Sequence, residues 1–357
     1  MKKIAALVIA IIALGAGIVA WRAARRPYRG FQGERVIEIA PHTPTIAIAR
    51  TLARNGVLRE RWPFLLLAGL GRMRGDRLMA GEYRFEGPVS PLDVFRKIAH
   101  GLIYLHKVVI PEGSDRFDMA RIYQRKLGID PQAFLKATRD TALIRDLDPQ
   151  APTLEGYLFP DTYRFPRGVS AMTVVKTMVM RFREVLKERF GNEMSHSKIP
   201  LHEAVTIASL VEKEADAPAE QPQIAEVFER RLKLGMPLGS DPTVIYAERL
   251  QGRFILDSQI RKSDLEDPSP YNTYANPGLP PGPICSPGAS SLEAVWHPAS
   301  GDYLYFVSRV QGGHMFARTL AGHLRNVARY RRELERIERS ATKGGGKPTP
   351  RRTNHGK

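Results

Sequence analysis

The chain opens with a long apolar stretch and continues with segments that alternate between strand-like and helix-like patterns. Ile4 to Trp21 carries no charged residue. As a helix it would span about 27 Å at ~1.5 Å per residue, close to the ~30 Å hydrocarbon core of a bilayer. Trp21 stands where an interfacial aromatic residue would lie. We therefore expect residues 1–30 to form a membrane anchor with a basic flank. A cleaved signal peptide is the alternative, for which Gly15-Ala16-Gly17 offers only a poor cleavage site.

The charges around this apolar stretch do not favour export of the residues that come after it. Four arginines lie on its C-terminal side and two lysines on its N-terminal side, which is opposite to the positive-inside rule for an exported domain. Long domains translocate largely regardless of flanking charge. We therefore still expect the anchor to be single-pass and the rest of the chain to be exported.

The segments after the anchor read as short βα units. Arg35 to Ala40 alternates like a strand, and Thr43 or Thr45 is placed to cap a helix that ends at Asn55. Leu78 to Phe85 is interpreted as a short hairpin around a Gly. This part predicts a small α/β region.

A second βα unit comes next, and helices dominate after it. Lys107 to Ile110 reads as a strand, and Asp115 to Leu127 as a helix that Gly128 ends. Ser90 opens a further helix before them. Later helices are expected at 171–190, 201–215, 223–234 and 320–339, with a buried strand at 302–310. Residues 235–288, rich in Pro and Gly, predict a long functional loop. The fold class is therefore α+β, with a larger helix-rich mixed domain.

Composition first suggests a polyanionic partner, but the position of the charges removes that argument. The chain has 357 residues, 54 Lys and Arg against 37 Asp and Glu, and a net charge of +17. Six of these charges lie in residues 1–30 and five in residues 341–357, which we expect to be a disordered basic tail. The remaining +6 forms no basic stripe interleaved with aromatic residues, so nucleic acid is not the expected partner.

Other common chemistries are also disfavoured. The single Cys excludes an intramolecular disulfide framework and a Cys-rich zinc site. His297, His314 and His323 lack a metal-binding spacing such as H-E-x-x-H, and the sequence has no P-loop, dinucleotide fingerprint or Gly-x-Ser-x-Gly motif. We expect neither a metal nor a cofactor.

Two carboxyl groups are candidates for catalysis. At about 100° per residue, Glu214 shares one face of its predicted helix with Ile207, Leu210 and Val211. A carboxyl on an apolar face is suited to act as a general acid, because burial disfavours its charged form. An ordinary ion pair at a helix end is the alternative. Glu155 lies in a short loop with aromatic residues, which suits either a sugar-binding platform or a tightly packed corner.

Several segments resemble the YceG-like (MltG) family of endolytic murein transglycosylases, in one order from about Val36 to Tyr330. The matching segments are Leu154–Tyr163, Ile207–Glu214, Leu234–Tyr246, Tyr271–Tyr274, Gly278–Ile284, Tyr303–Val307 and Gly312–Phe316. Gly239 departs from the family's pattern, which has a long polar residue at that position.

The resemblance implies an inner-membrane protein with one N-terminal helix, a LysM-like region at 31–106 and a periplasmic catalytic domain at 107–340. It also implies cleavage between N-acetylmuramic acid and N-acetylglucosamine within glycan strands, leaving 1,6-anhydro ends, on nascent strands. Glu214 corresponds to the family's catalytic acid, the second Glu of a Glu-Lys-Glu motif. Association with peptidoglycan synthases is implied only by the resemblance.

The remaining polar residues of these segments are expected to position the glycan substrate. They are Glu155, Asp241, Thr243, Tyr271, Asn272, Tyr274 and His314. Two alternatives stay open: a muramidase that activates water with Glu155 as the partner of Glu214, and a non-catalytic peptidoglycan-binding scaffold of the wall synthesis machinery.

Overall fold

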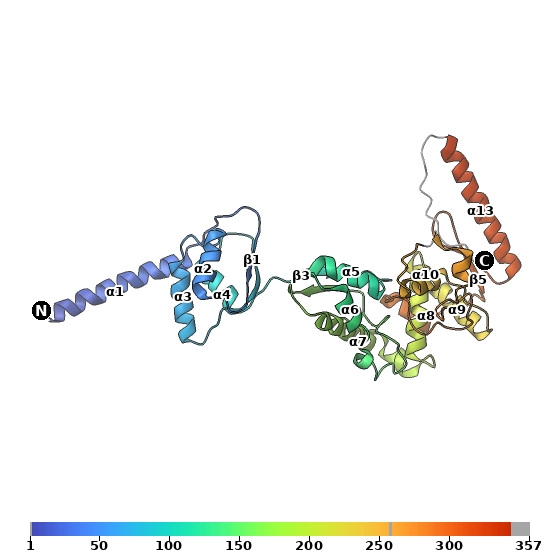
Figure 1. Ribbon diagram of the computed structural model, residues 1–357, viewed down its shortest axis with the longest axis horizontal. Coiled ribbons are helices and arrows are strands. Elements are labelled where there is room, and N and C mark those ends of the chain that lie inside the picture. The colour runs from blue at the N-terminus through green and yellow to red at the C-terminus, as the bar shows by residue number, and fades with distance from the viewer. Residues whose placement is uncertain (1, 257–258, 344–357) are drawn as a thin grey trace. The chain divides into compact units, whose positions relative to one another are not determined.

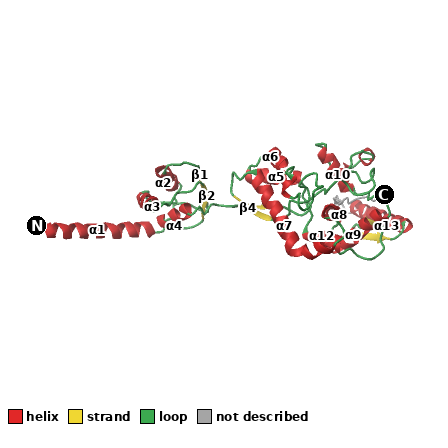
Figure 2. Ribbon diagram, turned by 90° about the horizontal axis from the view of Figure 1, so that it is seen from below, coloured by secondary structure: helices red, strands yellow, loops and turns green. Residues whose placement is uncertain are grey.

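The computed structural model describes residues 2–256 and 259–343, and the chain divides into two compact units. The first unit is Met1–Lys107 with Arg164–Gly168, and the second is Val108–Tyr163 with Val169–Lys357. Helices predominate in the part of the chain that is described, and its strands pair into three two-stranded sheets (Figures 1 and 2). The chain therefore has the mixed, helix-rich α+β fold predicted from the sequence.

The apolar N-terminal stretch forms one long helix, α1 (Lys2–Arg25). Within it, Lys3–Arg25 is long and apolar enough to cross a membrane, and its apolar 18-residue window is not buried by the rest of the chain. Its C-terminal part contacts α3 (Trp62–Met73) and α4 (Pro91–Ala99) of the same unit. This helix is therefore a candidate for a membrane span or a signal sequence.

The first unit has two strands and three helices besides α1. The strands β1 (Arg35–Ile39) and β2 (Gly81–Phe85) are antiparallel, with Ile37 opposite Tyr83. The helices α2 (Thr45–Arg54) and α3 lie between these strands in the chain. The predicted hairpin at 78–85 is wrong, because β2 pairs with the distant β1 rather than with its own neighbour. No strand pairing can be read from local alternation alone.

The helix boundaries follow the capping residues in most places. Ser90 makes a capping box with Asp93 at the start of α4, and Gly128 ends α5 (Arg116–Leu127) in the left-handed conformation. The prediction of a Thr cap for α2 is wrong. Pro44 occupies the N-cap position, and the Thr43 hydroxyl donates instead to the carbonyl of Ala40 at 2.7 Å.

The second unit is built from helices with short strands at its edges. Strand β3 (His106–Val109), at the junction of the units, pairs with β4 (Thr162–Phe165), and β5 (Tyr305–Ser308) pairs antiparallel with β6 (His314–Ala317). The helices, besides α5, are α6 (Pro131–Ala137), α7 (Ala171–His196), α8 (Leu201–Glu214), α9 (Gln221–Lys233), α10 (Asp241–Leu250), α11 (Lys262–Leu265), α12 (Ala289–Trp296) and α13 (Leu320–Lys343). Short 3-10 turns lie at Thr141–Leu143 and Pro218–Glu220.

Helix α8 lies at the centre of the second unit. All eight residues from 204 to 211 are buried, and α9, α10 and α12 contact the helix. A helix that is covered on every side has no single apolar face. The sequence interpretation of one apolar stripe is therefore too simple: α8 is enclosed along its middle and becomes accessible only at its two ends, one of which carries Glu214.

The Pro- and Gly-rich segment 235–288 is more ordered than the sequence predicted. It contains α10, whose first turn holds Asp241 and Pro242, and the short α11. Proline is well tolerated in the first turn of a helix, where its missing N–H costs nothing. At the other end of the chain, α13 extends through residue 343, three residues into the tail expected to be disordered. The rest of that tail lies outside the described residues.

Candidate active site

Glu214 is the last residue of α8 and is half-buried. The hydroxyl of Ser240 donates a hydrogen bond to Glu214 Oε1 at 2.5 Å. Ser240 occupies the N-cap position of α10, where a serine hydroxyl usually accepts from the helix backbone, yet here it makes no cap bond. Ser240 therefore lacks the capping hydrogen bond, which typically stabilises a protein by about 1 kcal/mol, and its hydroxyl instead binds the carboxyl group of Glu214.

Glu214 lines a small cavity of about 40 Å³. The other lining residues come from α9, the 238–239 turn, the Tyr274 loop, β5, β6 and α13; they are Arg231, Leu238, Gly239, Tyr274, Phe306, Val307, Ser308, His314 and His323. Glu214 is the only carboxylate among these described lining residues. The volume suits about one water-sized group, so a single substituent rather than a whole sugar ring could enter it.

Gly239 adopts a conformation that explains why this residue is glycine. Its φ is +57°, in the left-handed region, and its N–H donates to the Thr273 carbonyl at 3.2 Å. A Cβ built here would lie 3.4 Å from the Tyr274 ring, which is an ordinary contact. The backbone conformation therefore explains why this residue is glycine. The turn formed by this conformation places Ser240 against Glu214.

Gly239→Ala is expected to destabilise the protein by roughly 1–2 kcal/mol, because a Cβ is unfavourable in the left-handed region. Thermal unfolding of the two chains measures the difference. Gly191→Ala in α7 is the matched control, since its Cβ would meet nothing within 4 Å and alanine favours a helix. Equal melting temperatures for G239A and G191A would contradict the conclusion that the left-handed backbone at position 239 requires glycine.

Tyr274 and Asp241 form a linked pair beside the cavity. The Tyr274 hydroxyl donates to Asp241 Oδ1 at 2.5 Å, and Asp241 is buried at the start of α10. Burial and the neighbouring charge of Asp241 raise the pKa of Tyr274 well above its ordinary value. Tyr274 thus remains a neutral hydroxyl at the cavity wall, held in place by its bond to Asp241.

Thr243 and Asn272 hold loops in place and do not line the cavity. The Thr243 hydroxyl donates to the Ser240 carbonyl at 2.6 Å and lies 3.0 Å from the Thr273 hydroxyl. The Asn272 amide donates to the carbonyls of Leu265 and Asp267, at 3.0 and 2.8 Å. Both side chains are fully buried. Their contacts fix the α10 start and the 269–276 loop, so they act on the site indirectly.

Tyr271 and Glu155 belong to a separate buried cluster. The rings of Tyr271 and Tyr246 pack with centroids 5.1 Å apart, and Tyr246 donates its hydroxyl to Glu155 Oε2 at 3.0 Å. The Arg116 N–H also donates to Glu155, at 3.1 Å. Burial, with the nearby charge of Asp115, raises the pKa of Glu155 to about 8. Burial likewise raises the pKa of Tyr271 to about 12.

This arrangement does not favour the two-carboxylate alternative. Glu155 is 1% exposed, and its oxygens are occupied by Arg116 and Tyr246. It is not among the residues that line the Glu214 cavity. A hydrolytic muramidase would need both carboxyl groups to face the same sugar. Glu155 instead stabilises the packed corner that was the second interpretation of its sequence.

His314 does face the cavity, and Glu220 fixes its orientation. His314 Nδ1 lies 2.9 Å from Glu220 Oε2, and the His314 N–H donates to Glu220 Oε1 at 2.7 Å. A carboxylate only accepts, so Nδ1 carries the proton when the imidazole is neutral. The ring also packs edge-on against Phe306, with centroids 5.3 Å apart. The imidazole is thus held rigidly at the cavity wall.

Arg231 and Ser240 are functional candidates that the sequence analysis missed. The Arg231 guanidinium donates to the carbonyls of Leu304 and Leu238, at 2.8 and 2.7 Å. Burial lowers the pKa of Arg231, while the charges of Tyr305, Tyr274 and Glu214 act in the opposite direction. Arg231 is therefore a partly buried cation within electrostatic reach of Glu214. Because it lies on another helix, no local spacing connects it with Glu214.

Within the described residues, no group of three or more His, Cys, Asp or Glu side chains is placed to hold a metal ion. His323, considered among the histidines of the sequence, stacks on Tyr305 with centroids 5.3 Å apart and lines the Glu214 cavity.

Comparison with known proteins assigns the family. The model of the YceG-like family matches residues 37–329. The endolytic murein transglycosylase of Bacillus subtilis is 32% identical over 82% of this chain and 84% of that protein. The protein of that name from Streptococcus pneumoniae is 30% identical over 79% of this chain and 56% of its own length.

A solved structure agrees with this assignment. The crystal structure of a YceG-like protein from Listeria monocytogenes is 32% identical in sequence, with a TM-score of 0.56 over 82% of this chain and 98% of that chain. Several segments that carry the sequence resemblance contribute residues to the Glu214 cavity, among them Leu238, Tyr274 and His314. This chain belongs to the YceG-like family.

Proposed function

We propose that this protein is an endolytic murein transglycosylase, a lyase that cuts peptidoglycan glycan strands internally and leaves 1,6-anhydro-N-acetylmuramic acid ends. Family membership and the names of the curated relatives support murein transglycosylase chemistry. The observation that carries the mechanism is that Glu214 is the only carboxylate among the described residues lining its cavity. Hydrolysis by a pair of carboxylates needs a second one facing the substrate, whereas anhydro formation needs one group that acts first as acid and then as base.

In the first step, protonated Glu214 donates its proton to the glycosidic oxygen between N-acetylmuramic acid and N-acetylglucosamine. The C1–O bond breaks, and an oxocarbenium-like centre develops at C1 of the muramoyl residue. Glu214 becomes a carboxylate in this step. The Ser240 hydroxyl, 2.5 Å from Oε1, and the partly buried cation of Arg231 stabilise that new charge.

In the second step, the Glu214 carboxylate accepts the proton of the muramoyl C6 hydroxyl while that oxygen attacks C1. The product is a 1,6-anhydro ring, no water is consumed, and Glu214 is again protonated. The attack is intramolecular and so gains from proximity. We assign Tyr274, held by Asp241, and His314, held by Glu220, to positioning the sugar at the cavity mouth.

We place the enzyme at the inner membrane, anchored by α1, with the second unit in the periplasm and nascent strands as its substrate. The support is the length and composition of Lys3–Arg25 and the need of a peptidoglycan enzyme to reach the wall. The βααβ order of the first unit accords with a LysM-like, glycan-binding role for residues 31–106. Association with peptidoglycan synthases belongs to the same proposal.

Digestion of purified sacculi by the full chain in detergent tests the activity. Mass spectrometry of the released fragments should find anhydro-terminated muropeptide chains of several disaccharides. Fragments with reducing ends would show a hydrolase instead. Binding to sacculi without any released product would show a scaffold.

Ser240→Ala is expected to lower kcat by about 10–100-fold and leave KM nearly unchanged. A hydrogen bond to a charged group is worth about 1.5–3 kcal/mol, and this one strengthens as Glu214 loses its proton. The change is measured by the rate at which anhydro ends appear. Ser290→Ala, on α12 and outside the cavity, is the control. A KM effect without a kcat effect would show that Ser240 only helps to bind substrate.

A further inference from the structure

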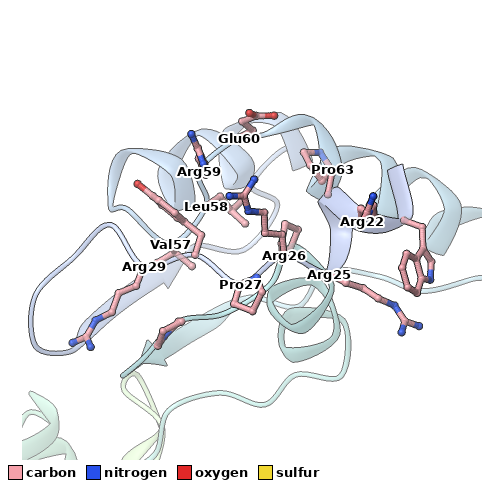
Figure 3. A pocket seen from close by; sticks show the side chains of 15 residues that line it. Arg22, Arg25, Arg26, Pro27, Arg29, Val57, Leu58, Arg59, Glu60 and Pro63 are labelled. Carbon is pink, nitrogen blue, oxygen red and sulfur yellow. The ribbon is translucent and has the colours of Figure 1, made fainter. Parts of the chain in front are cut away.

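A large basic cavity lies at the end of α1, within the first unit and separate from the active site. Its volume is about 920 Å³, and it is bounded by residues 21–29, residues 57–63 and two prolines (Figure 3). Five arginines and a single acidic residue line it; they are Arg22, Arg25, Arg26, Arg29, Arg59 and Glu60. Nothing in the proposed glycan chemistry uses this cavity.

None of these five arginines has a carboxylate partner among the described residues, and Arg22, Arg26 and Arg59 also make no side-chain hydrogen bond or ring contact there. The other charged groups are already engaged. Arg25 lies over the Trp21 ring at 4.8 Å, and Arg29 donates to the carbonyls of Phe31 and Gly33. The Glu60 carboxylate accepts from Trp62 Nε1 at 2.6 Å.

The uncompensated arginines come from two separate segments. Figure 3 shows Arg26 and Arg59 at the same cavity, near Leu58, with Arg22 toward Pro63. Guanidinium groups converging on one space create a positive potential that favours an anion. Their planar donors match phosphate oxygens, which they can bind in a bidentate manner.

The position of the cavity along α1 indicates where a phosphate bound in it would lie relative to the membrane. Trp21 ends the apolar stretch, and its ring is exposed, as expected for a residue at a membrane interface. The cavity begins at Trp21, so with α1 in the membrane it lies at the depth of the lipid phosphates. Pro27 and Tyr28, which line the cavity and are accessible, supply apolar surface beside the arginines, which suits the glycerol part of a lipid headgroup.

This arrangement also accounts for the unusual charge distribution of the anchor. Arginines on the exported side of a membrane helix act against the positive-inside rule. Four of the five cavity arginines are those on the C-terminal side of the apolar stretch. These arginines oppose export of the residues that follow α1. Binding of an anion by the folded unit at the membrane surface explains why they are present.

We propose that this cavity binds the phosphate headgroup of an anionic phospholipid of the membrane in which α1 is anchored. The inference rests on the anchoring of α1, but not on the activity of the active site. Arg22, Arg26 and Arg59 bind the phosphate, while Arg25 and Arg29 add to the positive potential. The bound lipid ties the first unit to the membrane surface.

The test uses the full chain in nanodiscs that contain phosphatidylglycerol and phosphatidylcholine at a ratio of 3:7. After extraction into mild detergent, native mass spectrometry measures which lipid stays bound. We expect phosphatidylglycerol to be enriched over its input ratio by about tenfold or more. Each arginine near an anionic membrane surface strengthens binding by on the order of fivefold, and three arginines together therefore support an enrichment of this size. R22Q/R26Q/R59Q should retain the two lipids at their input ratio.

The matched control is R50Q/R72Q/R77Q, which removes the same charge from exposed arginines of the same unit that do not line the cavity. It should retain the enrichment. Unchanged enrichment in R22Q/R26Q/R59Q, or equal loss in the control, would overturn the proposal. Displacement of the lipid by millimolar inorganic phosphate would show a site for soluble phosphate instead. Failure of the chain to co-elute with nanodiscs would show that α1 does not anchor the chain in a membrane, whatever the activity of the protein on glycan strands.

Discussion

Glu214→Gln is expected to fold like the wild type and to lose the release of anhydro-terminated fragments by roughly 10²–10⁴-fold. This is the usual contribution of a positioned general acid and base. Glutamine keeps the shape of the side chain and can still accept the hydrogen bond from Ser240 at 2.5 Å. It cannot deliver a proton to the glycosidic oxygen. The measurement is the initial rate of anhydro-end formation from purified sacculi, followed by mass spectrometry.

Glu203→Gln is the matched control for this experiment. Glu203 lies in the first turn of the same helix, α8, and is exposed. Its substitution removes the same charge at a distance from the cavity, so activity should be retained. If E214Q released anhydro ends at the wild-type rate, Glu214 would not be the acid. If E214Q melted far below the wild type, the loss of activity would reflect unfolding, and circular dichroism distinguishes the two cases.

Glu155→Gln is expected to change how stability depends on pH. The pKa of Glu155 is raised from 4.5 to about 8 in the folded protein, chiefly by burial. The folded state therefore holds a proton that the unfolded state releases above about pH 4.5. Stability should fall as pH rises from about 4.5 to about 8, and then level off. At one pKa unit per 1.36 kcal/mol, the total loss is about 3–5 kcal/mol.

Glutamine resembles the protonated form of Glu155 and cannot lose a proton, so E155Q should remove this loss of stability. Its oxygen can still accept from the Arg116 N–H or from the Tyr246 hydroxyl. Urea unfolding followed at pH 5 and pH 9 measures the effect: the wild type should lose several kcal/mol between them, and E155Q much less. Glu203→Gln again serves as control. Equal pH dependence in wild type and E155Q would show that Glu155 is ionised in the folded protein.

The two predictions concern carboxyl groups that the sequence treated as one possible pair. Both lie in segments that resemble the family, and both stand beside apolar or aromatic residues. The structure gives them different surroundings. Glu214 accepts a hydrogen bond from Ser240 and faces a cavity that His314 also lines, whereas Glu155 is enclosed by Arg116 and Tyr246. Sequence neighbours alone cannot distinguish an accessible carboxyl from an enclosed one.

Local features of the chain were predictable because their physical causes are local. An uninterrupted apolar stretch gave α1, and a Ser-Pro start gave the capping box of α4. Gly128 ended α5 as expected, and the helix predicted from Asp115 begins one residue later, at Arg116, with Asp115 as its N-cap. Capping and periodicity act within a few residues of the chain, so the sequence displays them directly.

Pairings between distant segments were not predictable. The partner of β2 is β1, which lies before two helices, and the hairpin expected from local alternation does not form. Likewise, a segment rich in Pro and Gly proved to contain α10. These outcomes depend on which surfaces must be buried together, and that information is spread over the whole chain.

By itself, the sequence determined the long apolar N-terminal helix, most of the helices and the position of Glu214 at the end of a helix. Only the tertiary structure decided what surrounds that carboxyl group. It enclosed α8 on all sides, turned Ser240 away from its usual capping role toward Glu214, and placed Arg231 within electrostatic reach. The physical reason is that a side chain's acidity and access depend on its neighbours in space, and here those neighbours come from α9, α10 and β6.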